Sequence, residues 1–132
     1  MKLILDIETD ELDATCIHLV VCKNIDTGQV TSFREWDKDI LQSYLDDTDQ
    51  LIMHNGISFD LPVLNRLWGI TFPYHKILDT LIVSQLHNPI RLGGNSLDNW
   101  GDILKLAKLP KPDSFKAYTP QMHRYCERDV DV

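Results

Sequence analysis

The alternation of apolar and polar positions predicts three strands at the start of the chain. From Lys2 to Glu8, every second residue is apolar on one side, so Asp6 and Glu8 fall together on the opposite face. Two further runs, Ile17 to Cys22 and Val30 to Trp36, have strand composition and are separated by a D-T-G turn sequence. These segments are expected to form a hairpin that continues an antiparallel sheet begun by the first strand.

After this sheet the spacing of apolar residues changes to the helical period, with short apolar runs between. Helix start signals mark the last two expected helices, Ser96 for the first and Thr119-Pro120 for the second. Alternating helices and short strands predict an α/β fold, a mixed five-stranded sheet flanked by helices. The expected helices are Asp37 to Leu45, one from about Asp60 through Trp68, Thr80 to His87, one from Ser96 through Ala107, and one from Thr119-Pro120 to the chain end; the expected strands are Leu51 to Met53 and His75 to Asp79.

Length and composition place the chain among ordinary globular domains. It has 132 residues, 43% apolar and 25% charged, which predicts one domain spanning 1–132. Three cysteines without C-x-x-C spacing suggest neither a disulfide framework nor a thiolate metal site. The first apolar run ends at Asp6, so neither an export signal nor a membrane segment is expected. These features predict a cytoplasmic protein with no membrane partner.

The charge is unevenly distributed along the chain. Residues 1–60 carry 4 basic and 13 acidic side chains, a net charge of −9, whereas residues 61–132 carry 9 basic and 7 acidic, a net charge of +2. An overall charge of −7 does not favour a phosphate-binding protein. It does not exclude one that meets a few nucleotides through bound divalent cations.

Four carboxylates stand at positions where a bound metal ion would explain them. Asp6 and Glu8 would repel each other on one strand face unless a cation lay between them. Asp60 begins a helix, where the positive helix end favours the charged form. Each has an ordinary alternative: a carboxylate that caps a turn at the strand end, and a simple helix cap.

Asp129 interrupts the apolar face of the last helix, which carries Met122, Tyr125, Cys126 and Val130. A carboxylate on such a face is costly unless it is paired or bound to metal, and no Lys or Arg shares the face. The alternative is that Asp129 lies at its rim. Oxygen ligands of this kind, without His or Cys, favour Mg²⁺ or Mn²⁺ over zinc.

In order along nearly the whole chain, these residues resemble the DEDD superfamily of 3′-to-5′ exonucleases, which have a ribonuclease H-like fold. Asp6-Ile7-Glu8-Thr9 resembles the first exonuclease motif, Asn55 through Asp60 the second, and Tyr125-Cys126-Glu127-Arg128-Asp129 the Y-x-x-x-D form of the third. The tyrosine is typical of the DEDDy branch, which includes the proofreading domains of family A DNA polymerases. Further segments are similar to short-tailed bacteriophage polymerases: His54-Asn55-Gly56, Ile77-Leu78-Asp79-Thr80-Leu81 and Leu97-Asp98-Asn99-Trp100-Gly101.

The resemblance implies a proofreading-type exonuclease that releases 5′ mononucleotides from single-stranded or frayed DNA. Two divalent ions, Mg²⁺ or Mn²⁺, would be held by Asp6, Glu8, Asp60 and Asp129, and Tyr125 would orient the attacking water. The implied partners are a single-stranded DNA 3′ end and a DNA polymerase domain or replisome component. For a viral protein, the compartment would be the cytoplasm of a bacterial host.

The same resemblance assigns four residues to the substrate. Thr9 would lie near the terminal 3′ hydroxyl, Leu12 would separate the last two bases, and Asn55 would contact the backbone. Their ordinary alternatives are a strand-end hydroxyl, a core leucine and a turn asparagine. Phe59 stands where the family often has tyrosine, which removes a hydroxyl but keeps a stacking face.

Some readings remain open at this point. The chain ends three residues after Asp129, so we expect a short last helix in a truncated domain or one that relies on a partner. An exoribonuclease of the ribonuclease D kind would use the same residues, and a catalytically silent domain could bind DNA or a polymerase. The strand-end position of Asp79 could bring it near the metals, but it is interpreted as the N-cap of the helix that begins at Thr80. Six basic residues could steer DNA but are interpreted as a solvated face: Lys105, Lys108, Lys111, Lys116, Arg124 and Arg128.

Overall fold

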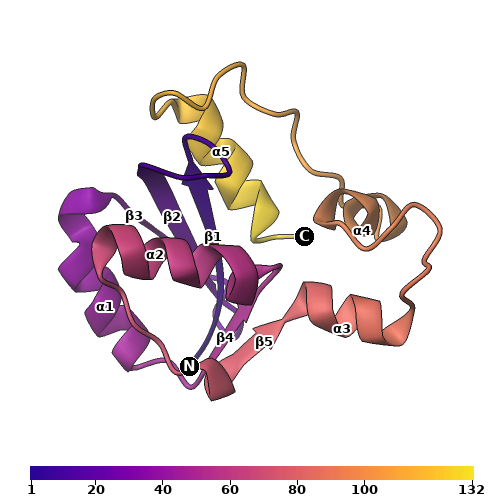
Figure 1. The fold of residues 1–132 in the computed structure, drawn as a ribbon, viewed down its shortest axis with the longest axis horizontal. Coiled ribbons are helices and arrows are strands. Elements are labelled where there is room, and N and C mark those ends of the chain that lie inside the picture. The colour runs from indigo at the N-terminus through magenta and orange to yellow at the C-terminus, as the bar shows by residue number, and fades with distance from the viewer.

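A mixed five-stranded sheet forms the centre of the protein, and helices cover both of its faces (Figure 1). The computed structural model describes all 132 residues. The spatial order of the strands is β3-β2-β1-β4-β5, so the first strand in sequence lies in the middle. The strands are β1 (Lys2–Thr9), β2 (Ile17–Asn24), β3 (Val30–Phe33), β4 (Gln50–Met53) and β5 (Ile77–Asp79).

The strand directions agree with the predicted mixed sheet. β1 pairs antiparallel with β2 and β2 antiparallel with β3, whereas β4 runs parallel to β1 and β5 parallel to β4. In β1, Asp6 faces Val21 and Glu8 faces Leu19 across the ladder, and the register shifts between Glu8 and Thr9. Because β1 and β4 are parallel, the segments that follow them leave the sheet at the same edge.

One face of the sheet packs against the first two helices and forms the main core. Leu3 and Leu5 of β1 are buried there together with Leu41 and Leu45 of α1 and Leu64 of α2. Truncation of such a buried leucine to alanine typically costs about 2–5 kcal/mol, so this layer contributes strongly to the stability. The helices are α1 (Lys38–Asp46), α2 (Leu61–Trp68), α3 (Thr80–His87), α4 (Leu97–Ile103) and α5 (Pro120–Asp129).

The opposite face of β1 and β2 is covered by α5. Leu19 and Val21 of β2 form a small cluster with Cys126 and with Val130, which follows α5. Thr119 caps the helix by accepting a hydrogen bond from the Met122 amide at 3.1 Å, as the Thr-Pro signal predicts. This packing turns the apolar face of α5 toward the strand that carries Asp6 and Glu8.

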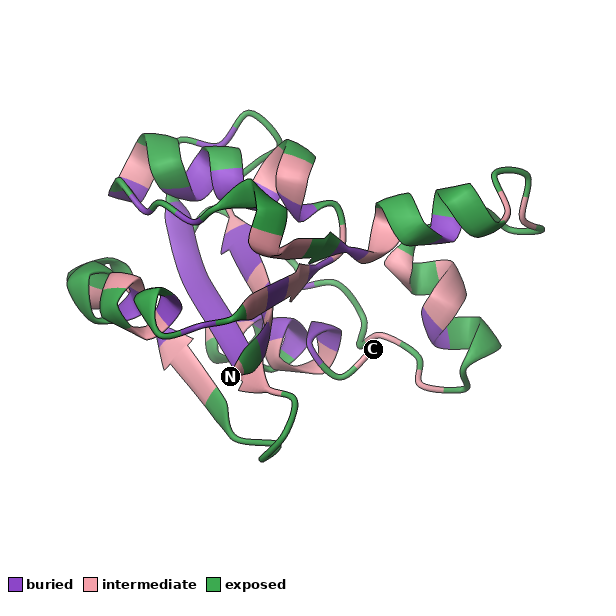
Figure 2. Ribbon diagram, turned by 90° about the horizontal axis from the view of Figure 1, so that it is seen from below, coloured by how far each residue is buried: buried purple, intermediate pink, exposed green.

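Helices α3 and α4 extend beyond β5 and are the least buried part of the fold (Figure 2). The Trp100 indole joins them by donating to the Ser84 hydroxyl at 2.7 Å. The apolar residues of α3, Leu81, Ile82 and Leu86, are expected from the sequence to point inward, and this is wrong for two of them: Leu86 is 81% and Ile82 41% exposed, whereas Ser84 is buried. The chain contains no helix with both the length and the hydropathy needed to cross a membrane.

Two predicted strands are shorter than expected because tight turns replace their ends. β3 ends at Phe33, and a 3₁₀ turn follows at Glu35–Asp37, in which Asp37 accepts from the Arg34 amide at 3.0 Å. β5 begins at Ile77, after a 3₁₀ turn at Tyr74–Lys76. Local side-chain bonds of this kind compete with the strand ladder.

Candidate active site

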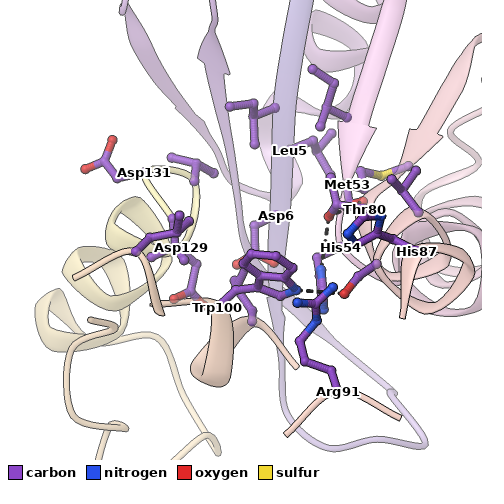
Figure 3. A pocket seen from close by; sticks show the side chains of 18 residues that line it. Leu5, Asp6, Met53, His54, Thr80, His87, Arg91, Trp100, Asp129 and Asp131 are labelled. Atoms are coloured by element: carbon purple, nitrogen blue, oxygen red, sulfur yellow. Dashed lines mark hydrogen bonds between the residues drawn. The ribbon is translucent and has the colours of Figure 1, made fainter. Parts of the chain in front are cut away.

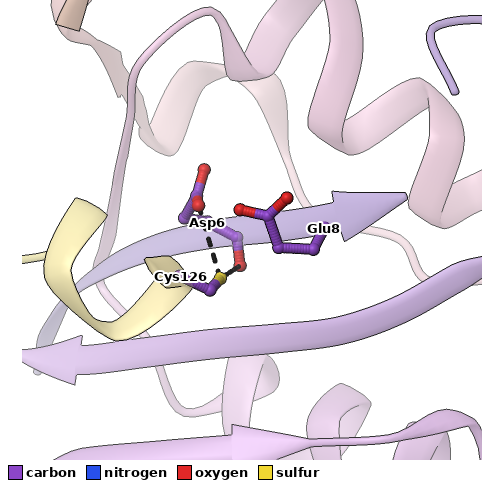
Figure 4. Close-up of side chains that lie close together, drawn as sticks. All are labelled: Asp6, Glu8 and Cys126. Carbon is purple, nitrogen blue, oxygen red and sulfur yellow. Dashed lines mark hydrogen bonds between the residues drawn. The ribbon is translucent and has the colours of Figure 1, made fainter. Parts of the chain in front are cut away.

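Asp6 and Glu8 lie side by side on β1, and Cys126 approaches them from α5 (Figure 4). One potential ligand atom from each of the three side chains falls within 4.8 Å of the others. The Cys126 thiol donates to Asp6 Oδ2 at 3.3 Å. The sequence did not identify this cysteine as a neighbour of the carboxylates, because only the packing of α5 on β1 brings them together.

Asp60 reaches the same region through an unusual turn between β4 and α2. Asn55 has a left-handed backbone with φ of 64°, and a π-helical turn follows at Gly56–Asp60. A Cβ at Gly56 would lie 2.5 Å from the Met53 Cβ, so only glycine allows this close approach. Asp60 makes no capping hydrogen bond, and its buried Oδ2 has no partner. The simple capping explanation therefore does not account for this side chain.

Asp79 holds that turn in place instead of joining the other carboxylates. Its two oxygens accept from the amides of Asn55 at 2.9 Å, Ile57 at 3.1 Å and Leu81 at 3.0 Å. Asp79 is thus the cap of α3, as predicted, and it also fixes the segment that carries Asp60.

Replacing Asp79 with alanine is expected to destabilise the protein by about 2 kcal/mol, because the helix cap and the amides of Asn55 and Ile57 lose their acceptor. Urea unfolding of Asp79→Ala beside Asp113→Ala, an exposed carboxylate, measures the difference. Equal midpoints for the two variants would contradict the anchoring role.

Asp129 is buried at the end of α5, with 8% of its surface exposed, so it does not lie at the rim of the apolar face. Its Oδ2 pairs with the Lys108 ammonium at 3.2 Å, whereas its Oδ1 is buried without a partner. The sequence interpreted Lys108 as part of a solvated basic face, and this was wrong. The missed cation comes from the loop before α5, so inspection of the helix face alone did not reveal it.

Burial raises the pKa of four carboxyl groups at this site, those of Asp6, Glu8, Asp60 and Asp129. The pKa of Asp6 rises to about 7, by burial and the charge of Asp129, and that of Glu8 to about 9, by burial and the charge of Asp6. Burial likewise raises the pKa of Asp129 to about 6, and it raises that of Asp60 well above its ordinary value. Lys108 opposes the rise for Asp6, Glu8 and Asp129. The protein thus gathers more carboxyl groups here than a single lysine can keep ionised.

The donor set fits a hard divalent cation. Asp60 and Asp129 each keep one buried carboxylate oxygen without a partner, and such atoms are costly unless something binds them. Carboxylate oxygens are the preferred ligands of Mg²⁺ and Mn²⁺. Asp6, Glu8, Asp60 and Asp129 are the residues that would hold the metal.

Tyr125 lies one helical turn before Asp129 and beside Lys108, whose ammonium is 4.9 Å from the centre of its ring. Burial raises the pKa of its phenol, and Lys108 opposes that rise. The hydroxyl therefore stays protonated near neutral pH and can donate a hydrogen bond. Phe115 packs edge-on against the Tyr125 ring, with 6.5 Å between ring centroids.

The four residues assigned to the substrate lie along the edge where β1 and β4 end. Thr9 ends β1, where its hydroxyl donates to the Glu11 carbonyl at 2.9 Å, and Leu12 is 90% exposed just beyond. Leu12 is therefore not a core leucine. Asn55 is exposed, whereas Phe59 is half-buried and packs against the main core.

A cavity of about 460 Å³ lies between the sheet, α3, α4 and the end of α5 (Figure 3). Asp6 and Asp129 line it, together with apolar side chains such as Ile4. Arg91 stacks over the Trp100 ring at 4.3 Å within this wall. The cluster of carboxylates is therefore bordered on this side by a largely apolar cavity.

The strand order, with one antiparallel hairpin added to parallel strands, defines a ribonuclease H-like α/β protein with a carboxylate group on its central strand. The chain belongs to the RNase H superfamily, whose family model matches residues 3–109. This match includes Asp6, Glu8 and Asp60, but it ends before Tyr125 and Asp129. No curated protein matches the chain by sequence.

Several solved structures share the fold. Brucella melitensis NrnC bound to pGG superposes with a TM-score of 0.74 at 20% identity, over 98% of this chain and 66% of NrnC. NrnC with bound Mg²⁺ gives a TM-score of 0.73 at 21% identity, with the same coverage. A family B DNA polymerase from the hyperthermophilic archaeon Pyrobaculum calidifontis gives 0.69 at 14% identity, over 98% of this chain and 23% of the polymerase. The chain thus spans just under two thirds of NrnC, and these likenesses show the fold.

Proposed function

We propose that this chain is a single metal-dependent 3′-to-5′ exonuclease domain that releases 5′ mononucleotides from single-stranded or frayed DNA ends. The observation that carries the proposal is the gathering of Asp6, Glu8, Asp60 and Asp129 from three elements, with buried carboxylate oxygens left unpaired on two of them. The Mg²⁺-bound relative NrnC supports a divalent cofactor for this fold.

The reaction adds water across the terminal P–O3′ bond, leaving a 5′ phosphate on the released nucleotide and a new 3′ hydroxyl on the strand. Divalent cations held by the four carboxylates would acidify the attacking water and offset charge on the leaving oxygen. Tyr125 donates from a protonated hydroxyl and orients the water. Its position one turn before Asp129 supports a place in the DEDDy branch, among proofreading domains like those of bacteriophage polymerases.

The test is incubation with an oligonucleotide carrying a 5′ label, with Mn²⁺, with Mg²⁺ and with EDTA. We expect a ladder that shortens from the 3′ end with either metal and stays intact in EDTA. A blocked 3′ terminus should protect the strand, and this control separates exonuclease from endonuclease action. An intact oligonucleotide in both metals would overturn the proposal and favour a silent binding domain.

Matched DNA and RNA oligomers of the same sequence address the substrate, because an exoribonuclease of the ribonuclease D kind would use the same carboxylates and tyrosine. We expect faster release from DNA. Faster release from RNA would retain the metal site and the direction of cleavage but replace the proposed substrate.

Replacing Leu12 with alanine is expected to slow cleavage of a frayed DNA end by about tenfold, on the order of one lost base-stacking contact. Stability should change by less than about 0.5 kcal/mol, because the side chain is exposed and touches no core. The control is Leu86→Ala, a similarly exposed leucine on α3, which should leave cleavage unchanged. Equal rates for both variants would remove Leu12 from the substrate site.

A further inference from the structure

Lys108 differs from the other lysines of its loop in where its charge lies. Its side chain is 16% exposed, whereas Lys105, Lys111 and Lys116 are exposed. Its ammonium is 3.2 Å from Asp129 Oδ2 and 4.9 Å from the centre of the Tyr125 ring. It forms the one salt bridge made by any of the four proposed metal ligands.

The backbone around Lys108 is held from both sides. Arg128 on α5 donates to the Ala107 carbonyl at 2.9 Å, and the Leu106 amide donates to the Gly101 carbonyl of α4 at 2.8 Å. A Cβ at Gly101 would lie 3.1 Å from the Leu106 carbonyl oxygen and 3.4 Å from the Lys108 nitrogen. The loop therefore passes so close to α4 that glycine is favoured at position 101, and Lys108 lies directly beside this contact.

The two carboxylate oxygens of Asp129 have different surroundings. Oδ2 is held by Lys108, while Oδ1 stays buried and unpaired. The ammonium contacts one carboxylate oxygen and the face of the neighbouring tyrosine at once, so a single side chain restricts both functional groups of α5. A cation–π contact of this kind contributes about 0.5–2 kcal/mol of attraction.

We propose that Lys108 is a positioning residue of the hydrolytic site, which holds Asp129 and Tyr125 in their rotamers and so keeps the tyrosine hydroxyl in place to orient the attacking water. This inference rests on the proposed exonuclease function. The positive charge of Lys108 also opposes cation binding at the same carboxylates. Lys108 should therefore favour turnover while weakening metal affinity, a combination that a purely structural residue would not produce.

The first variant is Lys108→Met, which keeps the length of the side chain and removes its charge. We expect kcat to fall about 10- to 100-fold, the order expected for misplaced reacting groups, with KM changed less than about threefold. Lys108→Arg should recover part of kcat. Lys111→Met, an exposed lysine three residues further along the same loop, should match the unmodified protein.

Calorimetric titration with Mn²⁺ in the absence of substrate gives a second readout. Lys108→Met should bind Mn²⁺ about 3- to 10-fold more tightly, because a like charge near the cation has been removed. Gly101→Ala tests the placement of Lys108 without altering any charged group. The added Cβ displaces the loop that carries Lys108, whereas alanine itself is favourable in a helix. This variant should lower kcat in the same way.

Unchanged or weaker Mn²⁺ affinity in Lys108→Met would overturn the proposal, and so would an unchanged kcat. Lower kcat with tighter Mn²⁺ binding supports it. Because the titration needs no substrate, it also decides whether Lys108 opposes the cation if the unmodified protein fails to cut DNA. Failure of the proposed function and failure of this inference are therefore separable.

Discussion

Replacing Asp6 with asparagine is expected to reduce exonuclease activity by about 10³-fold or more, because one of the four metal-holding carboxylates loses its charge. The same change should raise the melting temperature of the metal-free protein. Burial and the charge of Asp129 raise the pKa of Asp6 to about 7, so its charged form is a cost to folding at pH 8 in the absence of metal. Asp129→Asn should lose activity in the same way.

This pairing of effects distinguishes a metal site from a structural cluster. The rate is measured with a labelled oligonucleotide in Mn²⁺, and the melting temperature by circular dichroism in EDTA. Asp39→Asn, an exposed carboxylate on α1, is the matched control and should change neither quantity. An Asp6→Asn variant that retains activity would refute the assignment of the site, and so would one that fails to fold.

The metal-free protein is expected to lose stability as the pH rises from 7 to 8.5, by roughly 2 kcal/mol. Burial and the charge of Asp6 raise the pKa of Glu8 to about 9 in the folded state, well above its ordinary value of 4.5. Between these two values the folded protein binds more protons than the unfolded chain, so the free energy of unfolding falls as pH increases. The raised pKa values of Asp6 and Asp129 act in the same direction at lower pH.

Thermal unfolding in EDTA at the two pH values measures this loss, which corresponds to a decrease in melting temperature on the order of 5 °C. The pKa of His54 is lowered by burial, so its contribution changes below its ordinary value of 6.5 and outside this window. Saturating Mn²⁺ should remove the dependence, because a cation stabilises the charged carboxylates. Glu8→Gln should flatten it without metal. A stability that is constant or rising between pH 7 and 8.5 in EDTA would contradict the raised pKa values.

The strand and helix pattern was largely predictable because its signals are local. Period-two alternation placed Asp6 and Glu8 on one face of β1, and the Thr119 and Ser96 caps marked the starts of the last two helices. The mixed five-stranded sheet is confirmed. The errors fell where local turns compete with strands, at the end of β3 and the start of β5, and on α3, where an exposed Leu86 has the spacing of a buried one. The prediction was also too long for α4, which ends at Ile103 and not at Ala107.

The sequence by itself determined the order of the elements and which carboxylates were candidates, because periodicity, caps and motif spacing are written within a few residues of each other. Only the tertiary structure decided what surrounds those carboxylates. Lys108 and Cys126 reach Asp129 and Asp6 from segments distant along the chain. Burial and charge add up over all neighbours in space, so no local pattern can report the pKa of a side chain or the cation that pairs with it.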